Sequence, residues 1–143
     1  TRSSQISVSI HAGVMQSHPA DVMRGEETQI AGLLALQPDF EGLVCLPGTH
    51  TKWVTITDGR IQSFQTFMTG EAFALLTQPS VLRLTGLLIG HELSAIRPTH
   101  HVILIGAESL TRPYQTALQT LDTKATVLDS DSATLAGLSA SRS

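Results

Sequence analysis

Two short apolar runs constrain the fold of this chain more than any other feature of its sequence. Residues 43–46 read Leu-Val-Cys-Leu, and residues 101–105 read His-Val-Ile-Leu-Ile. A strand that is apolar along its whole length is usually buried on both faces, as in sheets that carry helices on each side. The two runs therefore predict a central sheet that lies between layers of helices.

Helix-like stretches alternate with the predicted strands. Residues 26–36 and 81–96 place apolar residues at helical spacing, and Pro38 and Pro98 follow these stretches as stop signals. We expect further helices over 71–77, over 109–121 with Ser109 as N-cap, and from about 132, and further strands over 6–10, 52–57, 60–67 and 125–128. The pattern predicts one α/β domain, residues 1–143, with a mixed sheet flanked by helices.

Composition excludes several classes of function. The formal net charge is −3 and no block of like charge occurs, so we expect no nucleic-acid partner. No apolar run reaches the roughly 18 residues of a membrane span, and no signal-peptide pattern opens the sequence, which predicts a cytoplasmic protein without membrane contact. Cys45 is the single cysteine, so no internal disulfide can form, and we expect it in the core. The six histidines show no metal-ligand spacing, so no metal site is predicted from them.

Two glycines four residues apart, Gly86 and Gly90, lie in the longest predicted helix. Small residues at this spacing allow a helix to approach a neighbouring element closely. The pattern therefore predicts close packing of this helix on its neighbour.

Four polar segments stand where α/β sheets bind ligands, at the ends of predicted strands or the starts of predicted helices. Arg24-Gly-Glu-Glu27 opens a helix, although its acids could simply match the helix dipole. Gly48-Thr-His-Thr-Lys52 follows a buried strand and offers N–H groups and hydroxyls to an anion, although a plain β-turn explains it equally well. Thr69-Gly-Glu71 and Gly106-Ala107 are weaker signals of the same kind.

Five segments, in this order, carry a resemblance to a known family. They are Asp21-Val-Met-Arg-Gly-Glu-Glu-Thr-Gln29, Leu46-Pro-Gly-Thr-His-Thr-Lys-Trp53, Phe67-Met-Thr-Gly-Glu71, Gly86-Leu-Leu-Ile-Gly90 with Glu92, and Leu104-Ile-Gly-Ala107. From about residue 21 to its C-terminus, the chain resembles the 2-dehydro-3-deoxygalactonokinase family of sugar-acid kinases. The resemblance implies ATP-dependent phosphorylation of the 6-hydroxyl of 2-dehydro-3-deoxy-D-galactonate, in galactonate degradation, by a two-domain enzyme of the actin-like, ribonuclease H-like fold.

The resemblance also implies a role for each matching residue. Glu27 would be the general base, with Glu26 as second candidate, and Arg24 would bind the substrate carboxylate. The other implied roles are sugar-pocket residues (Thr69, Gly70, Glu71), residues that cradle the phosphates of ATP (Gly48, Thr49, His50, Lys52) and residues that lie against adenosine (Gly106, Ala107). Mg²⁺ would arrive with ATP and be held mainly by the family's N-terminal domain.

The chain departs from the family pattern in two ways. The family's N-terminal domain, with its Asp-Trp-Gly-type phosphate loop, is absent, and several tens of family residues are missing near positions 82–83. These departures predict a C-terminal kinase domain with an internal gap, and an isolated chain without turnover. The alternative is a non-catalytic α/β remnant that binds a sugar acid, a nucleotide or another chain. A homodimer is also left open.

Overall fold

The computed structural model describes residues 12–75, 81–98 and 101–141, and its centre is a five-stranded mixed sheet. The strands lie in the order β5-β4-β3-β6-β7. Their bounds are Gly42–Leu46 for β3, Thr51–Thr57 for β4, Arg60–Phe67 for β5, Val102–Ile105 for β6 and Ala125–Leu128 for β7. The β3, β6 and β7 strands run parallel, whereas β4 and β5 are antiparallel to their neighbours. The carboxyl ends of β3 and β6 therefore lie side by side.

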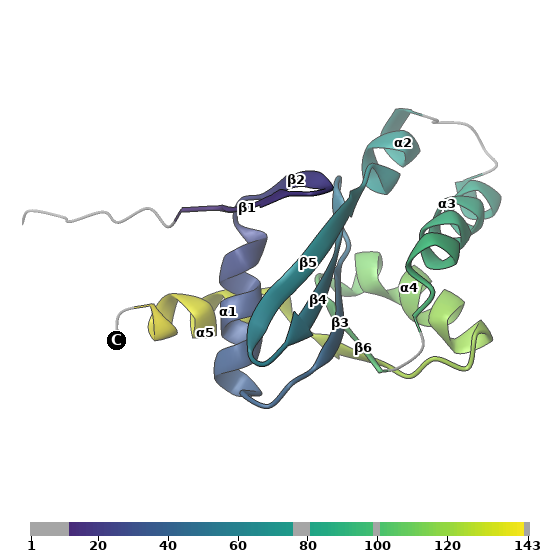
Figure 1. Cartoon of the computed structure of the whole chain (residues 1–143). Helices are drawn as coiled ribbons and strands as arrows, with labels where there is room; N and C mark the ends of the chain where they lie inside the picture. The colour runs from purple at the N-terminus through teal and green to yellow at the C-terminus, as the bar shows by residue number, and fades with distance from the viewer. Residues whose placement is uncertain (1–11, 76–80, 99–100, 142–143) are drawn as a thin grey trace, which may run out of the picture.

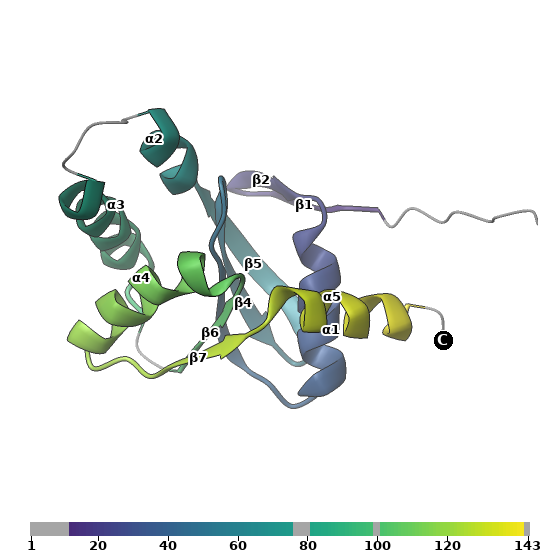
Figure 2. The same cartoon turned by 180° about the vertical axis from the view of Figure 1, so that it is seen from behind.

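Helices cover both faces of this sheet (Figures 1 and 2). One face carries α1 (Glu26–Leu36) and α5 (Ser130–Ala140), and the other carries α3 (Val81–Ile96) and α4 (Glu108–Thr120). Along β6, Ile103 and Ile105 belong to the core beneath α1 and α5, whereas Val102 and Leu104 belong to the core beneath α3 and α4. The prediction of a strand buried on both faces is therefore confirmed.

Most predicted elements are present, with small differences at their ends. The α1 and α3 helices and the β7 strand keep their predicted bounds. The short helix α2 (Thr69–Leu75) begins two residues earlier than predicted. The α4 helix begins at Glu108 with Ala107 as its N-cap, so the prediction of Ser109 as the cap is wrong. The strand predicted over 6–10 lies outside the described residues.

One hairpin was not predicted. Its strands, β1 (Val14–Ser17) and β2 (Ala20–Met23), pair antiparallel and form a separate two-stranded sheet. Gln16 anchors this hairpin to β5, because the Phe64 N–H donates to its side-chain oxygen at 3.0 Å. Met15 and Val22 are 80% and 55% exposed, whereas the polar Gln16 and Asp21 bond to β5, so the hairpin lacks the alternation of buried apolar and exposed polar residues that reveals a strand.

The prediction of close packing at Gly86 and Gly90 is wrong. Among the described residues, a Cβ built at either position would meet no heavy atom within 4 Å. Both glycines instead line a mainly apolar cavity of about 1220 Å³, which we call the large cavity and which lies between α3 and α4. The small residues of α3 therefore widen this space instead of closing it.

Close approach occurs between α1 and α5. A Cβ at Gly32 would lie 1.8 Å from the carbonyl oxygen of Ala133, and one at Gly137 would lie 2.0 Å from that of Thr28. The two helices therefore touch backbone to backbone, which only glycine permits at these positions. This contact fixes the two helices relative to each other, and their first residues line one cavity at the end of the sheet.

Three expectations from composition concern Cys45, membrane-spanning helices and metal ligands. Cys45 is fully buried beneath α3 and α4, as predicted, and its burial raises the pKa of the thiol well above the ordinary value. Over residues 12–75, 81–98 and 101–141, no helix has both the length and the apolar character to cross a membrane. The same residues contain no group of three His, Cys, Asp or Glu side chains that could hold a metal ion.

Candidate active site

A cavity of about 430 Å³, which we call the small cavity, lies where β3 and β6 end side by side. Open α/β sheets bind ligands at the carboxyl ends of their parallel strands. Six of the residues singled out from the sequence line it, namely Glu26, Gly48, Thr49, His50, Gly106 and Ala107. Segments that lie far apart in the sequence therefore meet at one point of the fold, as their positions after strands and before helices predict.

The start of α1 places its two carboxylates differently. The Glu26 carboxylate accepts a hydrogen bond from the Arg24 N–H at 3.1 Å, and the Glu27 carboxylate accepts one from the Gly25 N–H at 2.6 Å. Glu26 lines the small cavity, whereas Glu27 lines neither cavity. The family resemblance implies Glu27 as the general base and Glu26 as the second candidate, whereas Glu26 is the one that lines the small cavity.

The turn after β3 is held by the first turn of α2. The Glu71 N–H donates to the Thr49 carbonyl oxygen at 3.0 Å, and the Glu71 carboxylate pairs with His50 Nε2 at 3.1 Å. Gly70 lies so close that a Cβ there would be 2.3 Å from the Gly48 carbonyl oxygen. The turn and the start of α2 therefore lie in direct contact, and only glycine fits at position 70.

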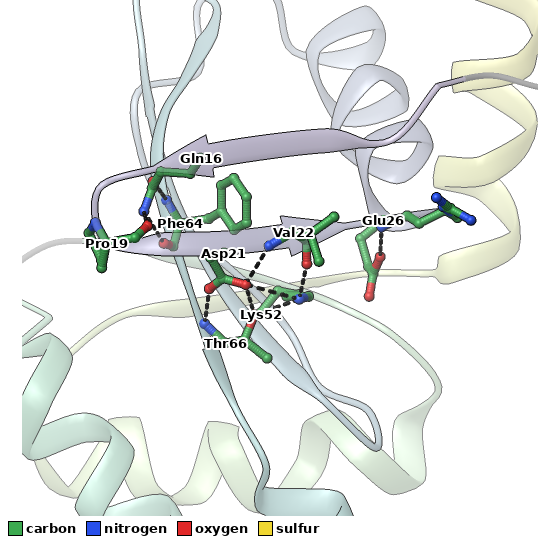
Figure 3. Close-up of polar contacts among 9 residues, drawn as sticks. Gln16, Pro19, Asp21, Val22, Glu26, Lys52, Phe64 and Thr66 are labelled. Carbon is green, nitrogen blue, oxygen red and sulfur yellow. Dashed lines mark hydrogen bonds and ion pairs between the residues drawn. The ribbon is translucent and has the colours of Figure 1, made fainter.

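Lys52, implied by the resemblance to face phosphates, is turned away from both cavities. Its side chain is 7% exposed, and its ammonium donates to the Val22 carbonyl at 2.6 Å and to the Thr66 hydroxyl, with an Asp21 carboxylate oxygen at 3.6 Å (Figure 3). Side chains alternate along a strand, so Lys52 shares a face with Val54, against the core that includes part of β2. Through these contacts Lys52 therefore holds the β1–β2 hairpin against the central sheet.

Asp21 is the anionic partner in this network. Burial alone would raise the pKa of its carboxyl. The hydrogen bonds that the carboxylate accepts from the Thr66 hydroxyl and the Val22 N–H, together with the positive charge of Lys52, lower the pKa by more than burial raises it. The pKa of Asp21 therefore lies below its ordinary value of 3.8. A carboxyl whose pKa is lowered by folding stabilises the protein above its unfolded-state pKa, and this contribution is lost as the pH falls through the folded-state pKa.

We expect Asp21→Asn to lower the free energy of unfolding at pH 7 by about 1–3 kcal/mol, because Lys52 then lacks its charged partner. The difference from the wild type should shrink as the pH falls below the ordinary carboxyl value of 3.8, where the wild-type carboxyl also loses its charge. Urea unfolding of both proteins across this range measures it. A difference that does not change with pH would show that the Asp21 charge is unimportant.

The remaining predicted residues do not line the small cavity. Thr69 and Gly70 line the large cavity, which shares Pro47 and Gly48 with the small one. The two cavities are therefore neighbours on either side of the turn after β3. Arg24 is exposed and lines neither cavity.

Sequence reasoning missed Ser130, the first residue of α5, which lines the small cavity. A local signal was present, because Asp129 caps this helix by accepting the Ser132 N–H at 2.9 Å. An Asp before an apolar helical stretch marks a helix start. Recognising this cap would have placed the beginning of α5 beside the end of β7, at the same edge of the sheet.

Comparisons with known proteins bear on what this site does. The family model described as 2-keto-3-deoxy-galactonokinase matches residues 1–85 and 82–141. A probable 2-dehydro-3-deoxygalactonokinase of Rhizobium meliloti (strain 1021) is 52% identical over 65 residues, which is 46% of this chain and 21% of the relative. The 2-dehydro-3-deoxygalactonokinase of Escherichia coli (strain K12) is 30% identical over 182 residues, which covers 88% of this chain and 62% of that protein.

A solved structure gives the same picture. The crystal structure of a Sinorhizobium meliloti protein assigned as a 2-dehydro-3-deoxygalactonokinase matches with a TM-score of 0.80 and 30% identity, over 91% of this chain and 64% of that one. The mixed sheet flanked by helices has the ribonuclease H-like, actin-like fold. This chain spans less than two thirds of the length of each of these relatives.

Within the aligned region, this chain is shorter than the Escherichia coli relative. The alignment with the Escherichia coli protein is longer than the 143 residues of this chain, so that relative carries residues in the aligned region that have no counterpart here. The two matches to the family model meet at residues 82–85. This is the region in which the sequence predicts an internal gap.

Proposed function

Because this chain belongs to the 2-keto-3-deoxy-galactonokinase family, we propose that its small cavity is part of a site at which ATP phosphorylates the 6-hydroxyl of 2-dehydro-3-deoxy-D-galactonate. One observation carries this proposal: an acidic helix start and two glycine-containing turns converge where β3 and β6 end. Phosphoryl transfer needs a group that orients or deprotonates the hydroxyl, and donors that hold the phosphates. Both kinds of group line the cavity. We place the reaction in galactonate degradation, in the cytoplasm.

Glu26 is the general base in this proposal. A base has to reach the proton that it removes, and the position of Glu26 on the cavity wall supports this role. The proton of the 6-hydroxyl passes to the carboxylate as the hydroxyl oxygen bonds to the γ-phosphorus and ADP leaves. Glu27, which the family resemblance prefers, is the second candidate. The exposed Arg24 guanidinium next to them would hold the substrate carboxylate through two parallel hydrogen bonds.

ATP would extend from the large cavity into the small one around the turn after β3. The resemblance implies that Gly106 and Ala107 lie against adenosine, but they precede α4, and the first N–H groups of a helix are suited to bind phosphate, so we assign them to the phosphates. Within the part of the chain that the structure describes, a Cβ at Gly48 would meet only the His50 carbonyl oxygen, at 3.8 Å, so the backbone is open to a ligand there. Thr69, Gly70 and Glu71 at the start of α2 would form part of the sugar-acid pocket, as the resemblance implies, with the Thr69 hydroxyl bonded to Glu92.

Mg²⁺ would enter this site with ATP. When bound, it would neutralise charge that develops on the transferred phosphoryl group. The described residues contain no three-residue cluster of metal ligands, and Lys52 is committed to the hairpin network. In this proposal the small cavity therefore supplies N–H donors and hydroxyls, and the family's N-terminal domain holds most of the metal's ligands.

We also propose that the chain corresponds to the second domain of this family, with an internal gap near residues 82–83. The point at which the two family matches meet supports this assignment, as does the length of the Escherichia coli alignment. We accordingly expect no phosphorylation by the isolated chain. The alternative function, a non-catalytic module that binds a sugar acid, a nucleotide or another chain, is favoured by the same missing residues.

Thr49→Ala tests the nucleotide part of the proposal. We expect ADP to bind the variant about tenfold more weakly than the wild type, because a hydrogen bond to a charged phosphate is lost. Binding of the sugar acid should stay within twofold. Titration calorimetry with each ligand measures both affinities. Thr57→Ala, at the exposed far end of β4, is the matched control and should change neither. A loss confined to the sugar acid would overturn the nucleotide role of the turn.

A further inference from the structure

One buried carboxylate has no part in the proposed reaction. Glu92 of α3 is fully buried, with 0% of its surface exposed. Its carboxylate accepts hydrogen bonds from Trp53 Nε1 at 2.8 Å, from the Tyr114 hydroxyl at 2.9 Å and from the Thr69 hydroxyl. These donors come from three separate elements, β4, α4 and α2. Glu92 therefore joins four elements, α3, β4, α4 and α2.

A carboxylate is rarely buried unless its oxygens are fully hydrogen-bonded, because desolvation is costly. Here one oxygen receives the indole N–H, and the other receives the two hydroxyl groups. Burial, together with the charge of Glu92, raises the pKa of the Tyr114 hydroxyl, which stays protonated and able to donate. Among the described residues, no buried side-chain nitrogen or oxygen lacks a partner. Glu92 therefore holds its three partners in fixed positions.

The hydrogen bond to Thr69 connects this network to the small cavity. Thr69 is the first residue of α2, followed by Gly70 against the Gly48 carbonyl and by Glu71, whose N–H donates to Thr49. Moving Thr69 would therefore move the turn that lines both cavities. The Thr69 side chain is directed inward to Glu92, so its hydroxyl serves this connection.

We propose that Glu92 is a positioning residue, which sets the place of the turn after β3 by holding Thr69. The proposal rests on the proposed function only in its last step, that this turn binds nucleotide phosphates. Its first step, that Glu92 fixes α2 and the turn, is a statement about this chain alone. The first step is measured by amide exchange at Glu71, and the second by the affinity for ADP.

Thr69→Val removes the donated hydroxyl while keeping the shape of the side chain. We expect the Glu71 N–H, which is bonded to Thr49, to exchange with solvent at least about tenfold faster in this variant. ADP should bind about tenfold more weakly. Thr69→Ser restores the hydroxyl and should return both quantities to within twofold of the wild type. A general loss of stability would not be rescued in this way.

Tyr114→Phe is the matched control, because it removes one donor from the same carboxylate, together with the hydroxyl contact to Thr51 at 3.0 Å, and leaves the bond between Thr69 and Glu92 in place. It should lower the melting temperature about as much as Thr69→Val, while the exchange of the Glu71 N–H stays within twofold of the wild type. Unchanged exchange in Thr69→Val, or equal acceleration in both variants, would overturn the proposal. If the wild type binds no ADP, the nucleotide role fails, and the exchange measurement still decides whether Glu92 positions the turn.

Glu92→Gln provides a second route if Thr69→Val does not fold. The carbonyl oxygen of the glutamine side chain can still accept the Trp53 N–H. The other end of the amide is an NH2 group, which cannot accept the hydrogen bond from the Thr69 hydroxyl. Trp53 is the only tryptophan in the sequence, so its single indole N–H resonance reports directly on the acceptor. We expect this resonance to shift and exchange at Glu71 to accelerate. A shifted indole resonance with unchanged exchange at Glu71 would contradict the positioning role.

Discussion

Gly32→Ala should prevent α1 and α5 from packing and should remove most of the stability of the domain. The added Cβ would lie 1.8 Å from the Ala133 carbonyl oxygen and 2.9 Å from the Gly137 nitrogen, which are both backbone atoms. No rotation of a side chain can relieve such a clash, so the helices have to move apart. We expect a loss of about 4 kcal/mol or more, against a total stability of about 5–15 kcal/mol for a natural domain.

Gly86→Ala is a suitable control, because it makes the same substitution within a helix where, among the described residues, no atom outside the local helix backbone lies within 4 Å of the new Cβ. It should leave stability unchanged or raise it by about 0.5–1 kcal/mol, since alanine favours the helix. Urea unfolding followed by circular dichroism measures both variants. If Gly32→Ala costs less than about 1 kcal/mol, the backbone contact between α1 and α5 described above is not present in solution.

Glu26→Gln should lower kcat by a factor of roughly 10²–10⁴, the usual cost of removing a general base. The variant is measured in a chimera, in which this chain replaces the matching residues of the Escherichia coli relative and the relative's unmatched residues complete the protein. Glutamine keeps the shape of the side chain, so the affinities for both substrates should hold. Glu27→Gln is the matched control and should cost much less.

The two acids are adjacent in a helix and point about 100° apart, so only one of them can face the substrate hydroxyl. If Glu27→Gln has the larger effect, Glu27 is the base, in the order that the family resemblance implies. If neither substitution lowers kcat tenfold, the pair only provides favourable charge at the start of α1.

Local sequence patterns were sufficient to predict most of the fold. The runs at 43–46 and 101–105 indicate buried strands without knowledge of any partner, and the bounds of α1 follow from its spacing and its stop signal. The β1–β2 hairpin could not be predicted in this way. It is held by Gln16 on β5 and by the pair of Asp21 with Lys52, which are contacts between residues far apart in the sequence.

The same distinction between local patterns and contacts over long sequence distances applies to the candidate site. The convergence of Gly48 and Gly106 follows from a general rule on strand ends in α/β sheets. The orientation of Lys52 was missed, although alternation along the strand already puts it on the face of Val54. The bond between Thr69 and Glu92 depends on how α2, α3 and α4 pack, and no local pattern encodes it.

Transfer of labelled phosphate from ATP to 2-dehydro-3-deoxy-D-galactonate by the chimera tests the proposed kinase site most directly. We predict that the label appears on the 6-hydroxyl of the acid, and that Glu26→Gln lowers the rate of its transfer by at least about a hundredfold. The isolated chain, measured alongside, should transfer none. A chimera that folds and binds ADP and the sugar acid, yet leaves the acid unphosphorylated, would contradict the proposal that this cavity is part of a kinase active site.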